Sequence, residues 1–120
     1  MFQLYGRNAD FEAEITVLTA EQGGRKQLPD NGIRWDFAYP EDRPTDQIYM
    51  IHPYFLDDKR IPLPKGQKVF GTKIALMFIL SERMIGYHRG KVFVGMPFQC
   101  REGRRVVALG KVTSLHALGE

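Results

Sequence analysis

The stretch FEAEITVL, residues 11–18, decides the fold class, because apolar and polar side chains alternate along it. Its apolar members are Phe11, Ala13, Ile15 and Val17, and two glutamates and a threonine separate them. Successive side chains of a β-strand point to opposite faces, so a period of two is typical of a strand with one buried face. We therefore predict a half-buried strand here.

A second stretch, IRWDFAY at residues 33–39, repeats the alternation, with its apolar and aromatic side chains at the odd positions. The segment between the two stretches contains Gly-Gly at 23–24 and Asn-Gly at 31–32, and both pairs favour turns. This segment is expected to form either one long hairpin loop or an extended excursion with two turns.

Further strands are expected at 47–55, 72–80, 91–94, 97–100 and 105–115, separated by segments that contain proline or glycine. The run at 72–80 is apolar on both sides, which predicts a strand with two buried faces. No segment shows a sustained helical stripe, so the sequence predicts an all-β fold, either an antiparallel sandwich or a barrel. The residues expected in its core include Ile15, Val17, Phe37, Ile74, Leu76, Phe78, Phe98 and Val107.

The composition favours one domain spanning residues 1–120. Hydrophobic residues make up 43% of the chain and charged residues 26%, as in ordinary globular domains. The longest apolar run, 74–80, is far shorter than the ~20 residues that cross a bilayer, and the N-terminus lacks the pattern of a secretory signal. Because Cys100 is the single cysteine, no internal disulfide is possible, and we expect a cytoplasmic protein without membrane contact.

Basic and acidic residues are unevenly distributed along the chain. Residues 1–60 hold 7 Lys and Arg against 11 Asp and Glu, whereas residues 61–120 hold 10 against 3. Such asymmetry indicates an anionic partner, either nucleic acid or an acidic protein face, unless the two halves interleave in the fold.

Motifs for catalysis, metal binding and nucleotide binding are absent from the sequence. Neither Gly-x-x-x-x-Gly-Lys-Ser/Thr nor Gly-x-Gly-x-x-Gly occurs, so we find no phosphate loop. His52, His88 and His116 lack metal-ligand spacing, and no signature of a nucleophile surrounds Cys100. We therefore expect no catalytic residues, no metal, no cofactor and no nucleotide.

Two blocks of the sequence resemble the C-terminal β-barrel domain of bacterial elongation factor Tu, here in a chain without the GTPase domain. The matching segments are FEAEI at 11–15, GGR at 23–25, NGIR at 31–34 and GMPFQCREGRRVVALG at 95–110. The resemblance covers residues 10–39 and 71–115, and the segment 40–70 is unmatched. It implies a six-stranded antiparallel β-barrel.

In that family the barrel grips the T-stem backbone of aminoacyl-tRNA and also packs against other domains and proteins. The resemblance therefore implies one functional hypothesis, an RNA-binding module for tRNA-like stems. Arg104 departs from the family, which has a glycine there, and it places a side chain where the RNA backbone would approach. The residues implicated in RNA binding are Gly24, Arg25, Arg101, Gly103, Arg104 and Arg105.

The second hypothesis is a protein-binding module, and the changes in the rim of the barrel favour it. Residues 87–94 have no counterpart in the family, and loops are where a specific function is most easily added. The basic half favours an acidic protein partner. Such a module would act as a translation-factor mimic or as an immunity-type protein that neutralises a toxin directed at translation. The expected partner-binding residues, of types common at interface hot spots, are Tyr87, Arg89, Trp35 and Tyr39. For Trp35, its alternation with neighbouring apolar residues makes a core role equally consistent.

Overall fold

The computed structural model describes residues 2–43 and 48–119, and strands dominate this part of the chain. The elements in chain order are β1 (Gln3–Leu4), β2 (Arg7–Asn8), β3 (Phe11–Val17), β4 (Trp35–Ala38), β5 (Tyr49–Phe55), β6 (Thr72–Ile79), η1 (Glu82–Met84), α1 (Ile85–His88), β7 (Pro97–Glu102), β8 (Arg105–Leu115) and η2 (Ala117–Gly119). Among these described residues, no helix has the length and apolar character needed to span a membrane.

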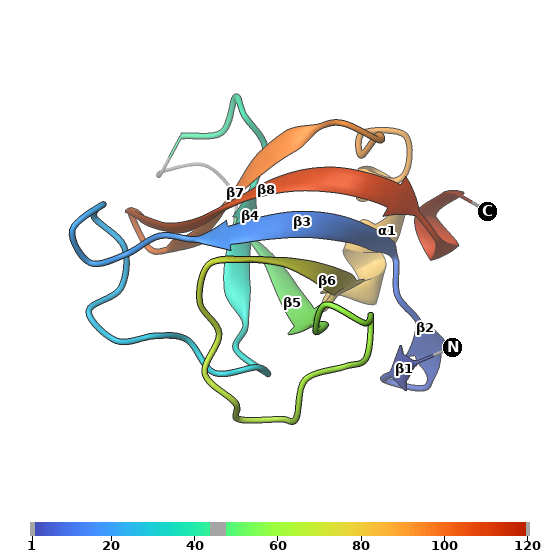
Figure 1. Cartoon of the computed structure of the whole chain (residues 1–120). Coiled ribbons are helices and arrows are strands. Elements are labelled where there is room, and N and C mark those ends of the chain that lie inside the picture. The colour runs from blue at the N-terminus through green and yellow to red at the C-terminus, as the bar shows by residue number, and fades with distance from the viewer. Residues whose placement is uncertain (1, 44–47, 120) are drawn as a thin grey trace.

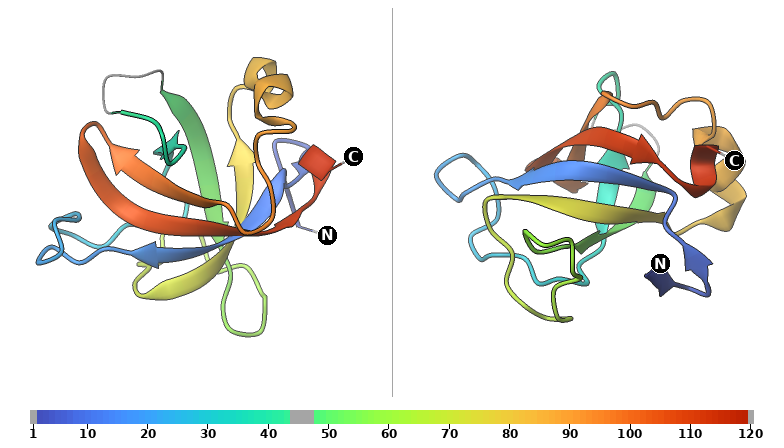
Figure 2. Two further views of the ribbon diagram at one scale, coloured as in Figure 1. Left: turned by 90° about the horizontal axis from the view of Figure 1, so that it is seen from above. Right: turned by 45° about the vertical axis from the view of Figure 1, so that its right-hand side comes forward.

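Six strands form a closed barrel in the order β3-β6-β5-β4-β7-β8, and pairing of β8 with β3 completes it (Figures 1 and 2). Every neighbouring pair is antiparallel. The predicted all-β class is confirmed, and so is the six-stranded antiparallel barrel that the resemblance implied. Closure gives each barrel strand two hydrogen-bonded neighbours, which removes the exposed sheet edges of an open sheet.

Aromatic rings fill the interior of the barrel. Phe11 packs edge-on against Phe37 and Phe98, with ring centroids 6.1 Å apart in both pairs. Gly110 lies opposite Phe98 in the ladder, and a Cβ at Gly110 would come within 2.2 Å of the Phe98 ring. Strand β8 therefore has a glycine where this ring needs the space of a side chain. The predicted core residues found in this interior cluster are Ile15, Val17, Phe37, Phe98 and Val107.

Strand β6 is buried on both faces, as predicted. The face expected to line the barrel interior, however, lies on the outside of the barrel. Ala75 and Met77 belong to the interior cluster. Leu76 and Phe78 belong to a second cluster outside the barrel, and the partly buried Ile74 packs against it. Leu76 and Phe78 are therefore buried core residues, as predicted, but of the outer cluster, and Ile74 is only partly buried. Two apolar faces give alternation no means to tell the inside of the barrel from its outside.

The short ribbon β1–β2 covers this outer cluster, with Leu4 packed against it. Asp10 fastens the ribbon to the barrel. Its carboxylate accepts a hydrogen bond from Nη1 of Arg7 at 2.8 Å and another from the backbone N–H of Ile79 at 2.7 Å. A fully buried carboxylate requires such partners, so these hydrogen bonds fix the position of the ribbon on the barrel.

Two connections differ from or refine the predictions. The expected strand at 91–94 is wrong, because this segment is a turn that follows α1. The connection from β3 to β4 follows the second of its two alternatives, with turns at 19–24 and 30–33 and extended chain between them. Asp30, at the start of the second turn, forms an isolated bridge with Lys68 of the β5–β6 connection.

Antiparallel strands place successive connections at opposite ends of the barrel. One end, here the loop end, carries the connections 18–34, 56–71 and 103–104. The other, here the helical end, carries η1, α1 and the rest of the β6–β7 connection, together with the ribbon and η2 (Figure 1). The residues expected to bind RNA and those expected to bind protein are distributed between these two ends.

Candidate binding surfaces

Two turns meet at the loop end. Arg25 of the first turn forms an ion pair with Glu102, with 2.9 Å between Nε and Oε2. The indole Nε1–H of Trp35 donates a hydrogen bond to the same carboxylate oxygen at 3.0 Å. Glu102 thus joins the turn at 19–25 to the tip of the β7–β8 hairpin.

Backbone geometry explains the glycines in these two turns. The N–H of Gly24 donates to the carbonyl of Thr19 at 2.9 Å, and a Cβ at Gly24 would lie 2.5 Å from the carbonyl oxygen of Leu18. Gly103 has a φ of +62°, a conformation that favours glycine. The resulting hairpin tip presents Arg104 and Arg105, both exposed, beside a shallow hollow of about 690 Å³.

Arg101 does not join this group. Its guanidinium donates to the backbone carbonyl of Asp42 at 2.9 Å and to the side-chain oxygen of Gln99 at 2.7 Å. It therefore braces β7 against the chain that follows β4. Of the six residues implicated in RNA binding, the structure brings five together at the loop end: Gly24, Arg25, Gly103, Arg104 and Arg105.

The loop end is basic as a whole. Residues 18–34, 56–71 and 102–105 hold 9 Lys and Arg against 5 Asp and Glu. This surplus of four exceeds the net charge of +3 of the entire chain. The positive charge of the protein is therefore concentrated at one end of the barrel.

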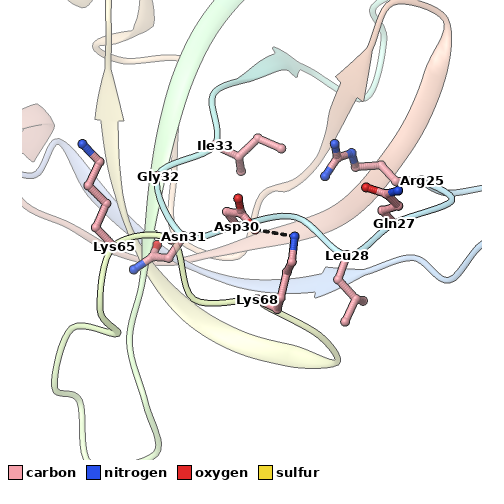
Figure 3. Close-up of a pocket in the computed structure, with 10 residues that line it drawn as sticks. Arg25, Gln27, Leu28, Asp30, Asn31, Gly32, Ile33, Lys65 and Lys68 are labelled. Carbon is pink, nitrogen blue, oxygen red and sulfur yellow. Dashed lines mark ion pairs between the residues drawn. The ribbon is translucent and has the colours of Figure 1, made fainter.

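A second hollow of about 380 Å³ lies at the loop end, between residues 25–33 and 65–68 (Figure 3). Asn31, which is 1% exposed, ties its walls together. Its amide Nδ2 donates to the carbonyl of Leu63 and its Oδ1 accepts from the N–H of Phe55, both at 2.9 Å. Sequence reasoning assigned Asn31 only to a turn and missed this role, because its partners belong to the unmatched segment.

At the helical end, Tyr39 and His88 form a buried pair. The Tyr39 hydroxyl and Nδ1 of His88 are 2.5 Å apart, and the two residues are 1% and 3% exposed. Burial lowers the pKa of His88 to about 4 and raises that of Tyr39 well above its ordinary value. Both side chains are therefore neutral at neutral pH, and they fasten α1 to the end of β4.

Tyr87 lies on the surface above this pair and is 43% exposed. Its ring stacks on that of Tyr49 with centroids 5.3 Å apart, and Nζ of Lys91 donates to its hydroxyl at 3.1 Å. Hydrogen bonds with Tyr49 and Lys91 lower the pKa of the Tyr87 hydroxyl. The neighbouring Arg89 is exposed and follows α1 directly.

The four expected partner-binding residues are thus divided. Tyr87 and Arg89 lie on the surface of the helical end. Trp35 and Tyr39 are each 1% exposed and belong to the interior cluster, so neither is a surface anchor. Their alternation with Phe37 indicated a core position, and the structure corrects their assignment accordingly.

An apolar groove of about 250 Å³ next to α1 was missed by sequence reasoning. Ile48 and Met50 of the β5 region and Met84 of η1 line it, and Arg83 lies at its rim. Ile48 and Met50 remain 60% and 40% exposed. The outward position of Met50 in the alternation of β5 is the one signal that pointed to this groove.

A comparison of the chain with models of known protein families finds no family that matches it.

Proposed function

We propose that this protein is a non-catalytic β-barrel module that docks a protein partner at its helical end. One observation carries the proposal: large apolar side chains are exposed around the groove beside α1. Ile48, Met50 and Tyr87 are 60%, 40% and 43% exposed, and the ring of Tyr49 links Tyr87 to the groove. Gathered apolar side chains of this size on one surface are typical of protein interaction sites.

The construction of the barrel supports a surface role. Its interior is filled by side chains, as expected for a small barrel, so ligands meet only its ends and outer faces. The groove is built by the start of β5 and its flank on one side and by the β6–β7 connection on the other. The resemblance to the C-terminal domain of elongation factor Tu supports translation-factor mimicry, or neutralisation of a toxin directed at translation, as the setting of the interaction.

The test compares three tagged forms of the protein as baits in native cell extract treated with RNase. Wild type and the loop-end control Arg104→Glu/Arg105→Glu are expected to recover the same partner. The Ile48→Ser/Met50→Ser variant, which alters only exposed side chains of the groove, is expected to lose it. Recovery of identical proteins by all three baits would contradict docking at the helical end.

The second candidate function is RNA binding at the loop end. The concentration of basic residues there, and the proximity of the Arg25 turn to the Arg104–Arg105 tip, favour it. Phosphate contacts make affinity depend steeply on salt, in proportion to the number of phosphates neutralised. The affinity should depend little on the RNA sequence, because such contacts are made with the RNA backbone.

A salt titration of tRNA binding tests this candidate. Replacement of Arg104 or Arg105 by alanine should weaken binding and reduce the slope of log K against log salt by about one each. The helical-end variant Ile48→Ser/Met50→Ser is the matched control and should bind tRNA as wild type does. Absence of tRNA binding at low salt would exclude this function.

A further inference from the structure

We propose that the 380 Å³ hollow at the loop end, hereafter the Arg25 cavity, binds a small organic acid. Arg25 would hold the carboxylate, and Leu28 and Ile33 would contact the apolar body of the ligand. This proposal is independent of protein docking, because the apolar groove lies at the other end of the barrel. It shares Arg25 with the RNA-binding candidate, whose Arg104 and Arg105 line the neighbouring hollow instead.

The cavity is preformed, because its two walls are joined by a satisfied network. The side chain of Asn31 bonds Leu63 and Phe55, its N–H donates to the carbonyl of Gln67 at 2.7 Å, and its carbonyl accepts from the N–H of Gly66 at 2.8 Å. All four polar groups of this buried residue are therefore satisfied, and its two backbone groups join the walls directly. A preorganised site loses little conformational entropy when a ligand binds.

The guanidinium of Arg25 is held in place at the edge of the cavity. Its Nε contacts Glu102, and Trp35 fixes Glu102 by a hydrogen bond from the indole. This contact is made through Nε and so does not use the terminal Nη atoms of Arg25. The planar fork of these donors matches the two oxygens of a carboxylate.

The charges around the cavity favour an anion with a single charge. Arg25, Lys65 and Lys68 are basic, and Asp30 and Glu102 are acidic, which leaves a surplus of one positive charge. Figure 3 shows Arg25 on one side of the Asp30–Lys68 pair and Lys65 on the other. A carboxylate balances this surplus, whereas a phosphate monoester carries a charge of about −1.5 to −2 and would exceed it.

The size and walls of the cavity fit an acid with an apolar body. Small-molecule sites range from about 300 to 1,000 Å³, and this one lies near the lower limit. Leu28 is 43% exposed, so a ligand that covers it removes apolar surface from water. Ile33 packs against the barrel core and provides a firm second wall.

The test uses phenylacetate as the probe and phenylacetamide as its neutral isostere, in ¹H–¹⁵N NMR titrations of the whole protein. Phenylacetate should shift the amide signals of Gly32 and Gly66, which line the cavity, and should bind at least tenfold more tightly than the amide. Arg25→Gln should weaken phenylacetate binding about tenfold or more. The control Arg104→Gln should leave phenylacetate binding unchanged.

Several results would overturn the proposal. These are no shift with phenylacetate, equal binding of the amide, tighter binding of phenyl phosphate than of phenylacetate, and equal losses in Arg25→Gln and Arg104→Gln. The comparison of acid with amide needs no variant, so the proposal stays testable even where Arg25→Gln fails to fold. None of these results bears on the helical end, so failure here leaves the proposed protein docking intact.

Discussion

Replacement of Asn31 by alanine should destabilise the protein by an amount that the structure sets. The substitution removes two side-chain hydrogen bonds and leaves the carbonyl of Leu63 and the N–H of Phe55 without partners. Asn31 is 1% exposed, so water replaces these bonds poorly. A buried polar group left unsatisfied costs about 1–3 kcal/mol. Two such groups predict a loss of about 2–6 kcal/mol in the free energy of unfolding.

Urea denaturation, followed by tryptophan fluorescence and by circular dichroism, measures this loss. Coincident transitions from the two probes would justify a two-state treatment. The control is Asn8→Ala, which removes one exposed hydrogen bond with Gln3 and should change stability by less than about 0.5 kcal/mol. A loss below about 1 kcal/mol in Asn31→Ala would refute the argument that this residue clamps the two loops.

A second substitution separates the two bonds of Asn31. In Asn31→Asp the carboxylate still accepts from Phe55, but it cannot donate to the carbonyl of Leu63 and instead faces it as a second acceptor. Burial and this repulsion raise the pKa of the new carboxyl in the folded state. The folded state then binds a proton more tightly than the unfolded state, so the deficit relative to wild type should shrink as the pH falls.

Three further predictions concern other parts of the barrel. Gly110→Ala should cost about 1–3 kcal/mol or more because its Cβ would overlap a core ring, whereas Gly86→Ala, with open space around it, should be neutral or mildly stabilising in the same melts. His52 and His88 are buried, which lowers each pKa from 6.5 to about 4. As the pH falls from 6.5 to about 4, the unfolded chain therefore takes up protons that the folded chain does not, and the free energy of unfolding should decrease. In His52→Gln, which keeps only one of these two histidines, this decrease should be less steep. The buried thiol of Cys100, whose pKa burial raises, should react with a thiol reagent only after denaturation, and rapid labelling of the native protein would contradict this.

Alternation of apolar and polar residues predicted strands such as β3 and β4 because one face of each is more buried than the other. Residues 11–17 and 35–38 follow this rule, and their inward side chains are those that the pattern selected. The rule failed at β6, where the outer face is also apolar because the β1–β2 ribbon covers it. Nothing in the local sequence of β6 indicates that Leu76 meets the ribbon, since that contact joins residues about 70 positions apart.

The candidate surfaces were less predictable than the strands because they consist of loops. Arg25 and Glu102, which meet at the loop end, both lie in the blocks 10–39 and 71–115 that carry the resemblance. The Asn31 clamp and the apolar groove also depend on residues of the segment 40–70, for which the resemblance supplied no expectation. Trp35 shows the converse error, since its residue type suggested an interface and its alternation placed it correctly in the core.

The two hollows lie at opposite ends of the barrel and are lined by different connections. Residues 25–33 and 65–68 line the Arg25 cavity at the loop end. The β6–β7 connection completes the apolar groove at the helical end. Because a filled barrel leaves its ends as the main sites for ligands, loop changes at one end alter binding there without repacking the core. Variants at the two ends should therefore act independently, and this separation allows each proposed function to be tested against the other.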